Sequence, residues 1–169
     1  MTVGILGFGW LGRAAAHALL NKNIKVKASK TKWPKGSGGV GVEPFALCIT
    51  EKTIVGDLTF FDAVNQLLIF LPPSQNNTGF SLLSVLEVLF KHITKTDIKR
   101  VIFTSSTSVY GPQSGIITEN TQVAPHTKNA KVLVQCEQFI QKQNVPSLIF
   151  RLGGLVGPDR NPINQLQHK

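Results

Sequence analysis

Three glycines near the start of the chain, Gly7, Gly9 and Gly12, constrain its fold more than any other feature. They lie in the stretch GFGWLG, where a short apolar run at 2–7 ends. From 10 to 20 the apolar residues recur at helical spacing. A glycine-rich turn between a buried strand and a helix is typical of the start of a βαβ unit. The sequence therefore predicts a strand–turn–helix at its N-terminus.

The remaining chain repeats this alternation of short apolar runs and helical stretches. In the second predicted strand, at 23–29, the lysines at 25 and 27 alternate with apolar residues. One face of this strand is therefore expected to contact solvent in part, which is unusual for a strand covered on both faces. Pro and Gly indicate a loop at 31–39. Further strands are predicted at 23–29, 44–50, 66–73, 100–106 and 147–154, and further helices at 80–93 and 127–143.

This order of elements predicts one α/β domain over 1–169, with a doubly wound parallel sheet of the Rossmann type and helices on both faces. In such a fold Gly7 would allow a tight turn, Gly9 would let a diphosphate approach the backbone, and Gly12 would let the helix pack closely on the sheet. The amides of Trp10 and Leu11, at the helix N-terminus, are candidate phosphate donors. The alternative is a glycine-rich turn in a domain that binds no ligand.

The end of the second strand is expected to contact the ribose of a bound dinucleotide. A carboxylate there would favour NAD, but the stretch at 28–32 has none and instead carries Ser29, Lys30 and Lys32. Two ammonium groups suit a 2′-phosphate, so NADP is predicted, with NAD as the alternative. The alternative is that these lysines simply belong to a solvent-exposed basic loop.

Net charge and cysteine content narrow the class of protein. The formal net charge of +9 favours anionic partners, although the lysines at 22–35 have too few aromatic neighbours to favour nucleic acid.

Cys48 and Cys136 are predicted to be core thiols of a reducing compartment, and the cytoplasm is the expected location. No metal site is predicted. No apolar run approaches the roughly 20 residues of a membrane span.

Two further motifs, FTSSTSVYG at 103–111 and RLGGLVGPDR at 151–160, join the glycine loop in the order found in a known family. Together the three resemble the short-chain dehydrogenase/reductases of the extended or atypical type, in the group similar to NAD-dependent epimerases and dehydratases. The resemblance covers nearly the whole chain. It implies that Ser106 polarises a substrate oxygen and that Lys131 holds the nicotinamide ribose. Leu71 and Pro72, at the end of the fourth strand, are candidate cofactor contacts, although a proline alone would explain that strand end.

The resemblance also implies an acid/base tyrosine four residues before Lys131, and that position is Thr127. A threonine hydroxyl is a far weaker acid than a phenol with a pKa of about 10. His126 is a substitute acid/base candidate, and Tyr110, the one tyrosine of the chain, is more typical of strand-end packing. Ser106 has a structural reading too, because serines at strand ends bond local backbone. The sequence also stops soon after Gly157, so the substrate lobe of extended members is expected to be largely missing.

These expectations lead to two functional predictions. The first is an NADP(H)-binding oxidoreductase, or a nucleotide-sugar epimerase or dehydratase, with an unknown small-molecule substrate and a degraded Tyr-x-x-x-Lys site. The second is a catalytically inactive module that senses NADP(H). The wide apolar face of the helix at 80–93 is consistent with a homodimer or with simple burial against the sheet.

Overall fold

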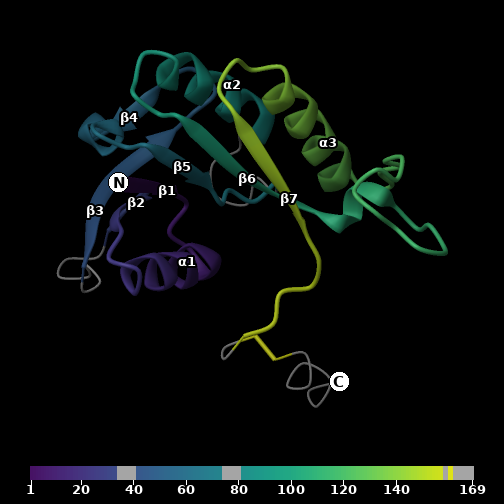
Figure 1. Ribbon diagram of the computed structural model, residues 1–169. Coiled ribbons are helices and arrows are strands. Elements are labelled where there is room, and N and C mark those ends of the chain that lie inside the picture. The colour runs from purple at the N-terminus through teal and green to yellow at the C-terminus, as the bar shows by residue number, and fades with distance from the viewer. Residues whose placement is uncertain (34–40, 74–80, 158–159, 162–169) are drawn as a thin grey trace.

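The computed structural model describes residues 1–33, 41–73, 81–157 and 160–161. Its central feature is a seven-stranded sheet in the order β4-β3-β2-β1-β5-β6-β7 (Figure 1). The neighbouring strands run parallel except for β4, which is antiparallel to β3. The strands are β1 (Thr2–Leu6), β2 (Lys25–Lys30), β3 (Val42–Ile49), β4 (Ile54–Gly56), β5 (Gln66–Ile69), β6 (Arg100–Ser106) and β7 (Ser147–Leu152).

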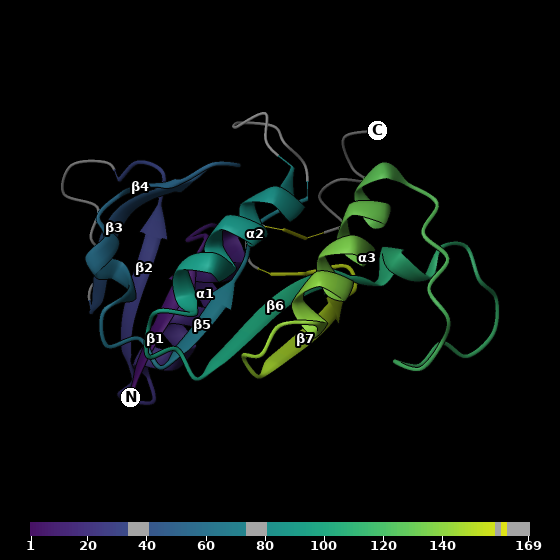
Figure 2. The same cartoon turned by 90° about the horizontal axis from the view of Figure 1, so that it is seen from above.

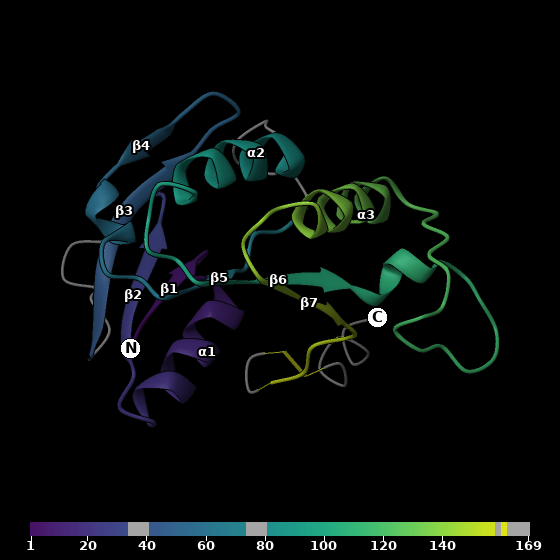
Figure 3. The same ribbon diagram turned by 45° about the horizontal axis from the view of Figure 1, so that its top comes forward.

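Helices cover both faces of this sheet, which confirms the predicted doubly wound α/β fold. Helix α1 (Trp10–Leu20) lies on one face, and helices α2 (Leu82–Ile93) and α3 (Lys128–Gln141) lie side by side on the other (Figures 2 and 3). Short 3₁₀ helices occupy Leu58–Phe61 and Thr107–Tyr110. The larger apolar core fills the space beneath α2 and α3, and a smaller one lies beneath α1.

The main differences from the predicted elements lie in the strands. Strand β4 was not predicted, because three residues are too few to show a periodic pattern. Strand β2 begins at Lys25 rather than at 23, since Asn23 has a φ of 55° in the turn that follows α1. Strands β5 and β7 end at Ile69 and Leu152, so the predicted strand ends at 70–73 and 153–154 are loops at the edge of the sheet. Most of the predicted loop at 31–39 lies outside the described residues.

Lys27 explains why a partly polar strand lies inside the sheet. Its Nζ donates to the carbonyl oxygens of Thr59 and Asp62 at 2.8 and 2.9 Å, and it lies 5.0 Å from the centre of the Phe45 ring. The aliphatic part of the side chain can therefore pack on the sheet while the ammonium group stays bonded. Lys25 is exposed, as expected.

Strand β7 forms one edge of the described sheet and is covered on one side only. Ile149 and Arg151 point to the face that carries α3, where Arg151 bonds to Glu137 of that helix. Leu148 and Phe150 alternate with them and are each 47% exposed. The face of β7 turned away from α3 therefore presents apolar side chains to solvent.

Candidate functional site

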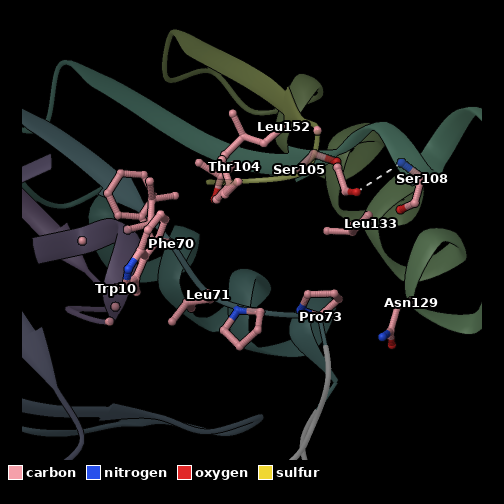
Figure 4. Close-up of a pocket in the computed structure, with 18 of the residues that line it drawn as sticks. Trp10, Phe70, Leu71, Pro73, Thr104, Ser105, Ser108, Asn129, Leu133 and Leu152 are labelled. Carbon is pink, nitrogen blue, oxygen red and sulfur yellow. Dashed lines mark hydrogen bonds between the residues drawn. The ribbon is translucent and has the colours of Figure 1, made fainter. Parts of the chain in front are cut away.

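A cavity of about 630 Å³ opens at the carboxyl ends of β1, β5, β6 and β7, between the N-termini of α1 and α3 (Figure 4). Strand β1 lies between β2 and β5, so the strand order reverses direction at β1. Open α/β sheets bind ligands at such a topological switch point, at the carboxyl ends of the strands. The cavity is lined by Gly7, Gly9, Trp10, Leu11, Gly12, Phe70, Leu71, Pro72, Pro73, Thr104, Ser105, Ser106, Ser108, Thr127, Asn129, Leu133, Leu152, Gly153, Leu155 and Arg160.

The three glycines of the first turn have three different environments. Gly7 has a φ of 99°, and a Cβ there would lie 2.5 Å from the carbonyl oxygen of Phe70. A Cβ at Gly12 would lie 2.5 Å from the carbonyl oxygen of Gly7, so this glycine lets α1 approach the strand. At Gly9 a Cβ would meet no atom within 4 Å. Glycine is thus needed for the fold at 7 and 12, while at 9 it leaves open space in the cavity wall.

The N-terminus of α1 carries no side-chain cap. Gly9 is the N-cap residue, and the first intrahelical bond runs from the amide of Arg13 to the carbonyl of Gly9 at 3.0 Å. The amides of Trp10, Leu11 and Gly12 precede that bond and have no intrahelical acceptor. Together with the helix dipole, they form an anion-binding position in the wall of the cavity.

At the opposite side of the cavity, the predicted hydroxyl groups are used by the backbone. Ser106 Oγ accepts a hydrogen bond from the amide of Ser108 at 3.1 Å (Figure 4). Thr127 Oγ1 accepts from the amide of Ala130 at 3.1 Å and caps α3. Both residues line the cavity, so each has a local structural role as well as access to a ligand. The neighbouring Ser105 Oγ is buried without a hydrogen-bond partner among the described residues.

Several predicted site residues are not among those that line the cavity. Lys131 is exposed on α3, one turn after Thr127, and His126 is exposed beside it. Tyr110 is buried, and its hydroxyl accepts from Arg151 Nη1 at 2.8 Å, which is the structural role expected of it. Lys131 follows Thr127 by four positions on α3, as the sequence predicts, and its contact with a cofactor stays a prediction.

The predicted ribose-contact residues at the end of β2 also lie outside the cavity lining. Ser29 is 1% exposed. Lys30 Nζ lies 5.3 Å from the centre of the Trp33 ring and 5.9 Å from that of Phe8. Trp33 is itself fixed by a 2.6 Å bond from Nε1 to the carbonyl of Phe45. Lys30 is thus held by two aromatic rings at the carboxyl end of β2, while Lys32 is exposed.

Sequence reasoning missed part of the cavity wall. Phe70, Thr104 and Asn129 line it, and so does Arg160 near the described end of the chain. Phe70 and Thr104 lie near the C-terminal ends of the strands predicted at 66–73 and 100–106, and Asn129 lies in the first turn of α3. Arg160 ends the motif at 151–160, but the motif does not indicate that this side chain meets Trp10, since its place depends on the return of the chain after β7. Among the described lining residues Arg160 is the one charged side chain, so the cavity has no carboxylate to repel an anion.

Two other classes of site find no support in the described residues. They contain no group of three or more His, Cys, Asp or Glu side chains arranged to hold a metal ion. None of the described helices combines the length and apolar character that a membrane crossing requires. Cys48 and Cys136 are both free thiols; Cys136 is buried in the core, as predicted, whereas Cys48 is only half-buried.

A family model described as the NAD dependent epimerase/dehydratase family matches residues 75–169, which is more than half of the chain. The chain belongs to the NAD-dependent epimerase/dehydratase family. This assignment confirms the resemblance to the family, and the matched residues include the motif Val109-Tyr110-Gly111 and the segment around Gly157. The protein YeeZ of Escherichia coli K12 is 36% identical to this chain over 170 residues, which cover 95% of this chain and 61% of YeeZ. The chain thus spans about three-fifths of the length of this relative.

Solved structures confirm the fold of this family member. UDP-glucuronic acid 4-epimerase from Bacillus cereus, in complex with NAD, matches 96% of the chain with a TM-score of 0.78 at 17% identity. A functionally unknown conserved protein from Silicibacter pomeroyi matches 98% with a TM-score of 0.73 at 25% identity. The chain covers 58% and 56% of these two proteins, respectively.

Proposed function

We propose that this chain binds a nicotinamide dinucleotide across the carboxyl edge of its sheet, as the cofactor-binding part of an oxidoreductase or a nucleotide-sugar epimerase or dehydratase. The observation that carries the proposal is the open space at Gly9 beside the uncapped N-terminus of α1. Family membership and the NAD-bound neighbours support it.

When bound, the dinucleotide supplies or accepts the hydride. The chain's own residues would divide the remaining work. The first-turn amides of α1 would hold the diphosphate, and Ser106 would orient a substrate oxygen with its hydroxyl proton, since its lone pair already accepts from Ser108. Lys131 would contact the nicotinamide ribose, and Thr127 or His126 would transfer the proton. Leu71 and Pro72, in the apolar part of the cavity wall, would pack against the cofactor.

We further propose NADP as the preferred dinucleotide, with NAD as the alternative. Lys30 lies at the carboxyl end of β2, with Lys32 two residues beyond it, and the described residues from Ala28 to Trp33 include no carboxylate. The rings of Trp33 and Phe8 hold the Lys30 ammonium near the edge where a 2′-phosphate would lie. The cytoplasm is the proposed location, since both cysteines are unpaired.

A second candidate is a binding module without turnover. It is favoured by one observation: the hydroxyl at the position of the acid/base tyrosine is that of Thr127, which caps α3. A capping threonine has neither the acidity nor the reach of a phenol. Self-association through α2 also stays a prediction.

Gly9→Val is the sharpest test of dinucleotide binding. A side chain at Gly9 meets no protein atom within 4 Å but would occupy the space proposed for the diphosphate. Gly154→Val is the matched control, because it is equally unobstructed and does not line the cavity. In titration calorimetry with NADH and NADPH, the wild type and Gly154→Val are expected to bind, while Gly9→Val folds normally and does not. Binding by all three proteins, or by none, would contradict the proposal.

Turnover then separates the two candidate functions. A panel of carbonyl compounds with NADPH, followed by absorbance of the reduced nicotinamide, is expected to show slow oxidation that Ser106→Ala abolishes. Binding without any oxidation across the panel would instead favour the module.

A further inference from the structure

The segment after β7 returns to the start of α1. Gly157 and Arg160 are joined by two backbone bonds: the amide of Arg160 donates to the carbonyl of Gly157 at 2.9 Å, and the amide of Gly157 donates to the carbonyl of Arg160 at 3.3 Å. This bonded pair lies against Trp10, the first residue of α1. The guanidinium carbon of Arg160 is 4.9 Å from the centre of the indole ring. A Cβ at Gly157 would overlap the same ring, so glycine is required for this close contact.

The charge of Arg160 is not balanced by a described carboxylate. The one ion pair in the described part of the chain joins Arg151 and Glu137, at the opposite side of β7. The described residues that line the cavity include no acidic side chain, and Arg160 is itself exposed. A guanidinium stacked on an indole keeps its N–H donors free in the plane of the group, where they can meet an anion in two parallel bonds.

We propose that Arg160, positioned by Trp10, binds a diphosphate group at the N-terminus of α1. Trp10 both supports the guanidinium and contributes one of the uncapped backbone amides, and Trp10 and Arg160 both line the cavity. The helix supplies a fixed partial charge, and Arg160, held against Trp10 beside the same helix end, adds a full one. This inference rests on the proposed function, because the diphosphate belongs either to the dinucleotide or to a nucleotide-sugar substrate.

The test compares Arg160→Gln with Arg100→Gln. Arg100 is exposed at the amino end of β6, away from the cavity, so its variant loses the same charge elsewhere. Calorimetry in one arm titrates NADH into the free protein. In the second arm UDP-glucose is titrated into protein saturated with NADH, and adenosine, which has no phosphate, serves as the control ligand. A lost charge-assisted bond at an exposed site should weaken the affected diphosphate ligand by about tenfold. Arg160→Lys should lose about threefold, since it keeps the charge and loses the planar fork.

Each outcome decides the inference. Weaker NADH binding by Arg160→Gln, with adenosine unchanged, assigns the diphosphate to the dinucleotide. Weaker UDP-glucose binding alone assigns it to the sugar nucleotide. Unchanged affinity in both arms, or an equal loss in Arg100→Gln, overturns the inference and leaves the proposed function standing. A wild-type protein that binds neither nucleotide overturns both. Gly157→Ala offers a second test: it retains the arginine but displaces residue 157 from the Trp10 ring, and should weaken binding of the same ligand.

Discussion

Arg151 on β7 and Glu137 on α3 form a paired contact across the helix–sheet interface. Arg151 Nη2 lies 2.7 Å from Glu137 Oε2, and Nε donates to both carboxylate oxygens at 3.2 Å. Arg151 Nη1 also bonds the hydroxyl of Tyr110, so one guanidinium joins β7, α3 and the V-Y-G segment. The hydrogen bond to Glu137 raises the pKa of Arg151 above its usual range. This contact fixes the strand whose C-terminal end leads to Arg160.

Glu137→Gln should destabilise the protein strongly. The Glu137 side chain is 4% exposed, and the substitution leaves the guanidinium of Arg151 without its anionic partner. The expected loss in the free energy of unfolding is about 3 kcal/mol, measured by urea denaturation. Glu87→Gln, at an exposed position of α2, is the matched control and should change little. An equal, small effect of both substitutions would mean that the pair adds nothing to stability.

Thr127→Ala tests whether this residue acts mainly as a helix cap. Loss of the bond to the amide of Ala130 should lower the free energy of unfolding by about 1 kcal/mol, and Thr127→Ser should restore it. Dinucleotide affinity should stay unchanged in both variants. A loss of turnover in Thr127→Ala that Thr127→Ser recovers, without a matching loss of stability, would instead assign the hydroxyl to the proton transfer.

Lys30→Ala should reduce the preference for NADPH over NADH. An exposed or half-exposed ammonium contributes up to about 1 kcal/mol to a phosphate contact, so the ratio of the two dissociation constants should change by about three- to fivefold. Lys95→Ala, at an exposed position after α2, removes the same charge far from β2 and should leave the ratio as it is. If the ratio of the NADH and NADPH dissociation constants is the same in Lys30→Ala as in the wild type, Lys30 does not contribute to cofactor selection.

Cys136 should resist alkylation in the folded protein. Burial raises the pKa of its thiol to about 12, and the charge of Glu137 adds to the shift. The folded pKa exceeds the unfolded value, so the thiol's contribution to stability is complete below pH 9 and decreases as the pH rises toward 12. Iodoacetamide at pH 8 should therefore label Cys48 first. Over pH 9–12, the wild type should lose more stability than Cys136→Ala, as followed by urea denaturation.

The parts that could be predicted from sequence are those whose signal is local. Gly7 and Gly12 are required by the turn in which they lie, and the apolar runs of β1, β5 and β6 are long enough to show a pattern. The place of Arg160 could not be predicted in the same way. Arg160 is 150 positions from Trp10 in sequence, so their contact depends on how the whole sheet is assembled.

Thr127 and Lys27 show a second limit. Its spacing from Lys131 could mark Thr127 as the position of a reactive hydroxyl. Only the structure of the N-terminus of α3 shows that its oxygen accepts a hydrogen bond from the amide of Ala130. Lys27 reads as a solvent-facing residue, yet its ammonium bonds two carbonyls that a sequence pattern does not bring together. In each case the side chain's partner is set by backbone geometry rather than by residue type.

The one-sided covering of β7 makes this edge of the sheet open more readily than its centre. With Leu148 and Phe150 each half exposed and no strand beyond it in the described sheet, β7 is held mainly by β6 and by the Arg151–Glu137 pair. Its amide protons should therefore exchange with deuterated solvent before those of β1, whose neighbours bond it on both sides. Because the turn that carries Arg160 follows β7, each such opening also removes the guanidinium from the mouth of the cavity.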